Sequence, residues 1–127
     1  MGTGATGAAR QGASVSIYEN TVAIGGTDDN SSVGATWIFV RNGTTWYQQG
    51  LKLVGTGNTG ASQQGYSVSL FEDTLAVAGY GDNLNAGATW IFVRNGTTWT
   101  QQGSKLVGTG ATGAAQQGRS ISLNTDT

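Results

Sequence analysis

Small and large side chains alternate along residues 66–71 of the chain. Ser67 and Ser69 alternate with Val68 and Leu70, which is the period of two expected of a β-strand. Side chains of such a strand point alternately to its two sides. The pattern therefore predicts a short strand with one face of small residues.

Three more strands are predicted downstream in the same unit. Large and small apolar residues alternate over 74–79, directly after a turn at Glu72-Asp73. The polar residues 81–87 are expected to form a connection, because Asp, Asn and Gly favour turns. Apolar side chains then occupy both faces of 88–94, as in a strand that is covered on both sides.

The last two strands of the unit are joined by Asn95 and Gly96. Both residue types tolerate positive φ, so the pair predicts a two-residue type I′ hairpin. The fourth strand is expected to run from about residue 97 toward 107, with a bend or bulge at Gly103. Four short antiparallel strands therefore follow one another within one unit.

The unit is repeated along the chain. The strings at 34–46 and 87–99 are identical and lie 53 residues apart, and Gly-Thr-Gly recurs at 2, 55 and 108. A fixed period of this size indicates a supersecondary unit that buries its apolar faces on its own copies. The chain holds about 2.4 copies. The predicted divisions are a connection at 1–11, a repeat at 12–54, a connection at 55–64, a repeat at 65–107 and a partial third repeat at 108–127.

The predicted fold class is all-β, with tandem four-stranded antiparallel sheets that resemble β-propeller blades. Four strands in a period of roughly 40–50 residues are typical of such blades. Stacked sheets lie about 10 Å apart, so bulky residues of one sheet can settle against small residues of the next. A single sheet would expose Trp37 and Phe39, or Trp90 and Phe92, at a cost of about 1.5–3 kcal/mol for each side chain. We therefore expect neighbouring copies to shield each other's large side chains.

Composition excludes several classes of function. The net charge is −1 and no cluster of Lys or Arg occurs, so nucleic acid is not an expected partner. No apolar run reaches the roughly 18 residues of a membrane-spanning helix, so membrane insertion is not expected. The chain has no His and no Cys, and the carboxylates of Glu19, Glu72 and Asp73 lie in turns, where we expect them to be solvated. We predict a protein that is not an enzyme and has no catalytic residues, no metal site and no cofactor.

Several motifs together resemble FG-GAP-type repeats, which build the blades of integrin-α-like propellers. They are Gln-Gly-x-Ser-Val-Ser-Leu, Asp-Thr-Leu-Ala-Val-Ala-Gly, Gly-Asp-Asn, Gly-Ala-Thr-Trp-Ile-Phe and Trp-x-Gln-Gln. Gln-Gly stands at 11, 64 and 117 where that family prefers Phe-Gly, and the Asp-rich calcium loop of many members is missing. The resemblance implies an extracellular or cell-surface repeat that is used in adhesion or surface assembly.

The connections at 28–30 and 82–85 carry the clustered oxygen donors of the chain. Hard cations need six or more oxygens, so we interpret these Asp and Asn residues as turn-forming side chains. Three Asn-x-Ser/Thr sequons add candidate N-glycosylation sites, which would matter in a secreted chain. They are Asn30, Asn42 and Asn95.

Trp46 and Trp99 recur in register and have two interpretations. Buried packing residues would recur in this way, and so would exposed platforms on which a sugar stacks. Arg41 and Arg94 end the third strand of each copy, and they either stack on these indoles or keep their charges in water. Packing is the favoured interpretation for the tryptophans, and glycan binding is the alternative.

The sequence at 108–127 restates that at 2–21, and two copies are too few to close a propeller of four to eight blades. Three resolutions are open. The chain is an excerpt of a longer array, or several chains form a ring, or chains add head to tail by donating a terminal strand. The strand available for donation consists of Ser120, Ile121, Ser122 and Leu123.

The favoured function is a non-catalytic extracellular structural module that self-associates into a ring or a filament. Its partner would then be further copies of itself. A glycan-binding propeller or adhesion domain is the first alternative, and an engineered propeller fragment is the second.

Overall fold

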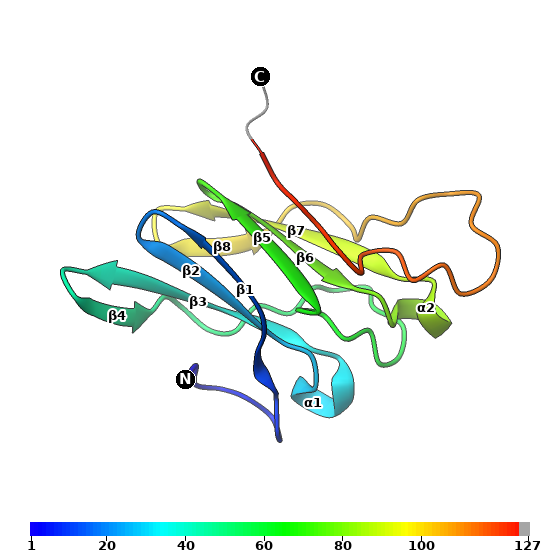
Figure 1. The fold of residues 1–127 in the computed structure, drawn as a ribbon, viewed down its shortest axis with the longest axis horizontal. Helices are drawn as coiled ribbons and strands as arrows, with labels where there is room; N and C mark the ends of the chain where they lie inside the picture. Colours follow the sequence, from blue (N-terminus) through cyan, green and yellow to red (C-terminus); the bar gives the residue numbers. More distant parts are fainter. Residues whose placement is uncertain (125–127) are drawn as a thin grey trace.

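Two four-stranded antiparallel sheets make up the computed structural model of this chain, which describes residues 1–124 (Figure 1). The strands of each sheet pair in sequence order, so neither sheet contains a crossover. The all-β class with propeller-blade-like sheets is thereby confirmed. The first sheet contains β1 (Gln11–Tyr18), β2 (Thr21–Gly26), β3 (Ala35–Asn42) and β4 (Thr45–Gln48). The second contains β5 (Ser67–Phe71), β6 (Thr74–Gly79), β7 (Ala88–Asn95) and β8 (Thr98–Gln101).

The two sheets share one register. Trp37 pairs with Ile24 in the first sheet, and Trp90 pairs with Val77 in the second. Corresponding residues of the two copies therefore meet corresponding partners. Because side chains alternate between the two sides of a strand, this common register places each copy's large residues on the same side of its sheet.

The hairpin between β7 and β8 differs from the expected type I′ turn. Asn95 pairs with Thr98, so the two loop residues are Gly96 and Thr97 rather than Asn95 and Gly96. Gly96 has a φ of 66°, whereas Asn95 keeps a negative φ. A glycine with positive φ at the first loop position is what a type II′ turn requires. The Asn-Gly signal locates the hairpin correctly, but the loop lies one residue further along.

The fourth strand is shorter than predicted. β8 ends at Gln101, and the chain bends at Gly103, where φ is 74°. The chain returns at Leu106, which forms a single antiparallel bridge with Thr89 of β7. The predicted bend at Gly103 is confirmed, and the residues beyond it contribute a bridge instead of a continuous strand.

Short helical turns lie between the second and third strand of each sheet, at α1 (Asp29–Ser32) and α2 (Asp82–Asn85). Asn30 and Asn83 have φ of 49° and 48°, so neither turn is a regular helix. Asn enters this left-handed region more readily than most residues because its side chain can hydrogen-bond locally. The predicted polar connections thus contain compact turns, each of which begins with a buried aspartate.

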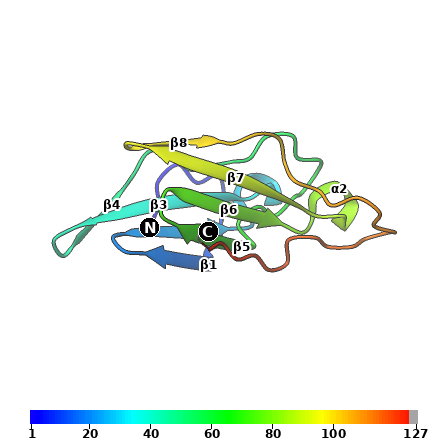
Figure 2. The same cartoon turned by 90° about the horizontal axis from the view of Figure 1, so that it is seen from above.

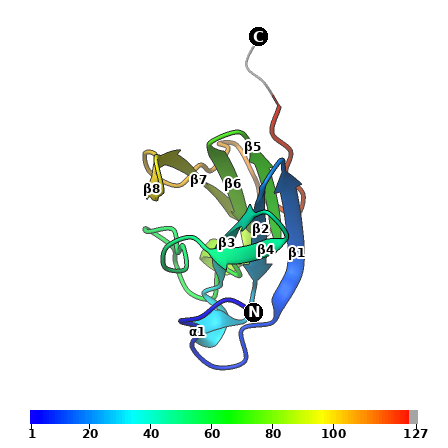
Figure 3. The ribbon, with the colours of Figure 1, turned by 90° about the vertical axis from the view of Figure 1, so that its left-hand side faces the viewer.

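The second sheet packs on the first through its edge strand β5. β5 runs beside β1 and also contacts β2 (Figure 2, Figure 3). Val68 and Leu70 of β5 are buried in one cluster with Ala23 and Ile38 of the first sheet. The sheets therefore shield apolar side chains by facing each other, as the repeat predicts.

Candidate functional site

The contact between the two sheets shows how one copy of the repeat accepts the next. Val68 and Leu70 are 8% and 5% exposed because they face the first sheet, where Ala23 and Ile38 lie. Burial of large aliphatic side chains of this kind contributes about 1.5–3 kcal/mol each. The interface is therefore a substantial part of the core and not an incidental contact.

Two serine hydroxyls fix the register of this interface. Ser14 Oγ donates to the Gly65 carbonyl at 2.7 Å, and Ser16 Oγ accepts from the Leu70 N–H at 3.0 Å. Small residues on β1 allow the backbone of β5 to come within hydrogen-bond distance. The small-residue face that the alternating pattern predicts has this role.

Arg94 and Trp99 hold the outer part of the interface. The Arg94 guanidinium lies 4.9 Å from the centroid of the Trp99 ring and pairs with Asp73 at 2.8 Å. It also donates to Thr21 Oγ1 and Gln49 Oε1, each at 3.1 Å, and Trp99 Nε1 donates to the same glutamine oxygen at 2.9 Å. Arg94 therefore stacks on the indole. Asp73 lies in a turn and is 66% exposed, as the prediction of a solvated carboxylate expects, but it is paired with Arg94, which the prediction did not include. We call Arg94 and Trp99, with their acceptors Thr21 and Gln49, the latch.

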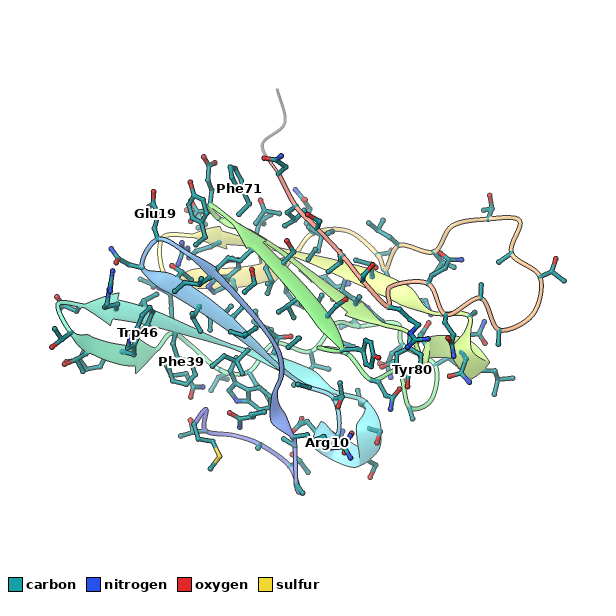
Figure 4. All side chains as sticks on the ribbon, viewed as in Figure 1. Arg10, Glu19, Phe39, Trp46, Phe71 and Tyr80 are labelled. Carbon is teal, nitrogen blue, oxygen red and sulfur yellow. The ribbon has the colours of Figure 1, made fainter. Side chains whose placement is uncertain are left out.

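The outer face of the first sheet presents the same kinds of side chain without a neighbour. Val15 and Ile17 are 64% and 61% exposed, although their counterparts in β5 are buried. Trp46 is 39% exposed, against 8% for Trp99. Figure 4 shows Phe39 and Trp46 side by side on β3 and β4. We call this surface the leading face, and it consists of Val15, Ile17, Val22, Ile24, Phe39 and Trp46.

A shallow hollow of about 370 Å³ lies on the leading face. The side chains that line it are apolar, and they belong to Met1, Val22, Ile24, Phe39 and Trp46. Beside it, the Arg41 guanidinium lies 5.5 Å from the centroid of the Trp46 ring. One half of a second latch is therefore already formed, and its acceptors are not supplied by the described residues of this chain.

The opposite face of the second sheet is uncovered in the corresponding way. Ile38 and Thr36 are buried in the first sheet, whereas their counterparts Ile91 and Thr89 are only partly buried. Leu106 is 56% exposed. This surface matches the one that the first sheet offers to β5. We call it the trailing face, and it consists of Ser69, Thr74, Thr89, Ile91, Gln102 and Leu106.

Residues 119–124 lie across part of the trailing face. The Leu123 N–H donates to Ser69 Oγ at 2.8 Å, which repeats the bond between Leu70 and Ser16 in the interface inside the chain. Ser120, Ile121, Ser122 and Leu123, the predicted donor strand, belong to neither sheet. The segment therefore occupies the place that β5 has in the internal interface, as the edge strand of a sheet that is not provided by residues 1–124.

The acidic residues of the polar connections have structural partners. Asp29 is buried, pairs with Lys52 at 2.6 Å, and accepts from the Thr6 N–H at 2.6 Å. Asp82 is also buried and pairs with Lys105 at 2.6 Å. The interpretation as turn-forming side chains misses these ion pairs, because each lysine lies 23 residues downstream. Within residues 1–124, no group of three or more His, Cys, Asp or Glu side chains is arranged to hold a metal ion.

Gln64 has a role that the sequence shows only as a departure from the Phe-Gly motif. Its side-chain amide accepts from the Gly55 N–H at 2.6 Å and donates to the Gly55 carbonyl at 3.0 Å, in a fully buried position. Gln11 and Gln117 make the corresponding bonds in their copies. The strict recurrence of Gln-Gly in the repeat is the signal from which this clamp could have been inferred.

A cleft of about 440 Å³ lies between the β1–β2 and β5–β6 turns. Tyr18 packs against Phe71 at this end of the interface, with ring centroids 4.9 Å apart, and Figure 4 shows Glu19 near Phe71. Loss of hydration raises the pKa of the Tyr18 phenol, and the charges of Glu19 and Glu72 raise it further. The phenol is thereby moved away from the range in which it would exchange protons near neutral pH.

The residues predicted for glycan chemistry lie in different surroundings. Asn30, Asn42 and Asn95 are all exposed, as an acceptor for glycosylation must be. Trp46 is partly exposed, but Trp99 is buried against the first sheet. Of the two tryptophans, only Trp46 therefore offers its indole to a ligand from solution.

No protein-family model matches the chain, and no curated protein matches it. The likeness to FG-GAP repeats therefore stays a prediction from the motifs. Within the part of the chain that the structure describes, no helix has the length and apolar character to cross a membrane.

Proposed function

We propose that this protein is a non-catalytic structural module that assembles with further copies of itself. The leading face of one copy packs against the trailing face of the next, as the two sheets do inside one chain. The observation that carries the proposal is the contrast between Trp46 and Trp99. They end identical sequences and differ in exposure because a sheet lies in front of only one of them.

Both halves of the internal interface recur at the uncovered faces. On the leading face, Val15 and Ile17 repeat the buried pair of β5, and on the trailing face Ile91 repeats Ile38. An apolar surface that one copy leaves in water therefore fits the surface that another copy presents. Large exposed apolar patches on soluble proteins are typical of sites that bind other proteins.

The polar contacts of the latch also recur at the two faces. Arg41 and Trp46 on the leading face repeat its donors. Thr74 and Gln102 on the trailing face repeat its acceptors. Arg41 already binds Asn20 Oδ1 through Nε and Nη2, at 3.1 and 2.8 Å. In the proposed contact, Nη1 of Arg41 and the indole N–H of Trp46 donate to Gln102 of the next copy.

This contact joins two different faces, so it continues beyond a pair of copies. Contacts of this kind give rings when the rotation closes and filaments when it does not. We place such an assembly outside the cell or on its surface, in an adhesive or structural role. The exposed sequons and the resemblance to FG-GAP repeats support that setting.

The leading face suits a protein surface better than a sugar. Sugar and other small-ligand sites combine apolar or aromatic contact with several convergent polar groups. The side chains around the hollow near Trp46 are apolar. Self-assembly is therefore favoured over glycan binding at this face.

Sedimentation velocity over a range of protein concentrations tests the proposal. We expect the mean mass to rise above the 13.0 kDa of one chain as the concentration increases. Trp46→Glu should weaken association on the order of 100-fold, because assembly would bury a carboxylate in place of the indole that packs there. The thermal stability of the isolated chain should change little, since the side chain already contacts water.

Tyr47→Glu is the matched control, because neighbouring residues of a strand point to opposite sides of the sheet and Tyr47 is 55% exposed. This variant should associate like the wild type. A wild-type chain that is monomeric at every concentration would contradict the proposal, and so would a Trp46→Glu variant that assembles normally.

A further inference from the structure

Each sheet is held by the connection that precedes it in the chain. Trp37 Nε1 donates to the Thr3 carbonyl and Trp90 Nε1 donates to the Thr56 carbonyl, both at 2.8 Å. A Cβ at Gly2 would overlap the Trp37 ring, so backbone and indole are in direct contact. The connection therefore cradles the buried indole of the sheet that follows it.

The connection at 55–64 also binds the sheet that precedes it. Its N–H groups at 63 and 64 donate to the carbonyls of Ser32 and Val33, at 2.8 and 2.9 Å. Ser62 Oγ donates to the Val33 carbonyl as well, at 2.9 Å. One connection thus bridges two sheets and fastens one copy to the next.

Residues 108–118 bind the sheet that precedes them in the same way, but within residues 1–124 there is no following sheet for them to bind. The N–H groups of Gln116 and Gln117 donate to carbonyls at the end of α2, at 2.7 and 2.9 Å. The other side, which would cradle an indole, faces no sheet within residues 1–124, and Gly108 is exposed.

The part of 108–118 that would contact a following sheet already has the backbone conformation of the equivalent part of 55–64. The clamp of Gln117 on Gly108 is closed, with bonds of 2.7 and 3.1 Å. Gly110 and Gly113 have φ of 88° and 73°, against 81° and 72° at the equivalent glycines of 55–64. A segment that is ordered in its bound conformation loses little conformational entropy when it binds.

Assembly through the leading and trailing faces places two segments of similar sequence in one position. Residues 108–124 of one copy and 2–18 of the next are equivalent in the repeat, so both belong between the same two sheets. We infer, on the basis of the proposed self-association, that the copies exchange segments: residues 108–124 of one copy replace 2–18 of the next. This exchange fastens the copies as 55–71 fastens the two sheets of one chain.

β1 is suited to being replaced because it is the edge strand of the first sheet and pairs only with β2. Val15 pairs with Ile24 and Ile17 pairs with Val22 in that ladder. After the exchange, the donated Ile121 and Leu123 occupy the positions of Val15 and Ile17. The side chains remain aliphatic, so the apolar pattern of the leading face is kept.

Arg119 favours the donated segment over the resident one. Its guanidinium lies 5.9 Å from the centroid of the Tyr66 ring and 5.7 Å from that of Tyr80. Figure 4 shows Tyr80 at the α2 end of the second sheet, where this segment passes. The equivalent residue of 2–18 is Ala13, which has no charge to place over these rings. The aromatic pair therefore holds the donor on its own sheet while the rest of the segment reaches the next copy.

Alanine substitution at equivalent glycines tests the exchange. Within one chain, a Cβ at Gly108 meets only the Gln117 side chain, whereas a Cβ at Gly2 overlaps Trp37. After exchange, the methyl group of Gly108→Ala would overlap Trp37 of the next copy. We expect Gly108→Ala to lower the association constant by about tenfold or more in sedimentation velocity, and Gly2→Ala to raise it by weakening the resident segment.

The outcomes separate the exchange from self-association itself. If Gly108→Ala assembles as strongly as the wild type, the exchange is overturned while the proposed function stands. If the wild type stays monomeric at every concentration, the proposed function fails and the exchange fails with it. Circular dichroism and thermal unfolding of each variant confirm that the chains compared are folded.

A lysine substitution gives an independent test that does not depend on the glycines. Under exchange, Leu123→Lys charges the strand that enters the interface, and it should weaken association on the order of 100-fold. Docking without exchange does not bury residue 123 between two sheets. A Leu123→Lys variant that associates like the wild type would therefore overturn the inference.

Discussion

Trp46 and Trp99 end two identical stretches of sequence, but the structure leaves the first partly in water and buries the second. Each pairs with an arginine in the same register, Arg41 and Arg94 respectively. The difference comes from the first sheet, whose Gln49 accepts the Trp99 N–H. Burial at this position is thus a property of the pair of sheets rather than of the strand that carries the indole.

Trp37 and Trp90 behave differently, because both are fully buried. Each is covered by its own preceding connection, through Thr3 in one copy and Thr56 in the other. Trp37 is buried together with Ala9 and Ala35 of its own copy, which corrects the expectation that a neighbouring copy is needed to shield this side chain. The outer tryptophan of the same sheet needs a second copy.

Alanine substitution of Trp46 and of Trp99 should show the largest difference in the free energy of unfolding between the two copies. Trp99→Ala removes a buried ring together with its stacking on Arg94, so we expect a loss of about 3–5 kcal/mol in the free energy of unfolding. Trp46→Ala, measured at low protein concentration, should cost less than about 1 kcal/mol, because much of its ring is already in water. Urea unfolding followed by circular dichroism gives both values.

Protein concentration sharpens this comparison. If copies assemble, the loss for Trp46→Ala should grow with concentration, because binding to the next copy stabilises only the wild-type chain. Losses that are equal at low concentration would contradict the assignment of Trp46 to an uncovered face.

Alanine substitution of Gln64 and of Gln117 should show a smaller difference in stability between the copies. Gln64→Ala leaves the N–H and carbonyl of Gly55 buried without their partners, so we expect a loss of about 1–3 kcal/mol in the free energy of unfolding. Gln117 makes the same two bonds at an exposed site, where water can replace them. Gln117→Ala should therefore cost less than about 0.5 kcal/mol in the same urea experiment. Equal losses would mean that the 108–118 segment is covered in solution.

The strands were predictable because their signals are local. The bounds of β6 agree with the alternating segment at 74–79, and Gly103 marks the bend after β8. The hairpin loop lies one residue further along the chain than the Asn95-Gly96 signal predicts, because Asn95 pairs with Thr98 in the ladder. Local propensity identifies the turn, but the cross-strand pairing sets its position.

The contacts that join the elements were not predictable from the pattern. Asp29 looks like a turn residue until Lys52, on a different connection, is placed beside it. The exposure of the leading and trailing faces was not predictable for another reason. Identical strings have identical hydrophobic patterns, so the pattern does not tell which copy is covered. Only the structure distinguishes the copy that is covered, and that distinction supports both proposals.

The last expected change is an increase in the free energy of unfolding rather than a loss. Thr36 is fully buried, and its Oγ1 has no hydrogen-bond partner within the described residues. A buried hydroxyl without a partner destabilises the folded state, so Thr36→Val should raise the free energy of unfolding by about 1 kcal/mol. Thr89→Val, at the partly exposed equivalent position, should change it by less than about 0.5 kcal/mol. If Thr36→Val instead destabilises the chain in paired urea titrations, its hydroxyl is solvated or bonded, and the first sheet is less tightly covered than the geometry indicates.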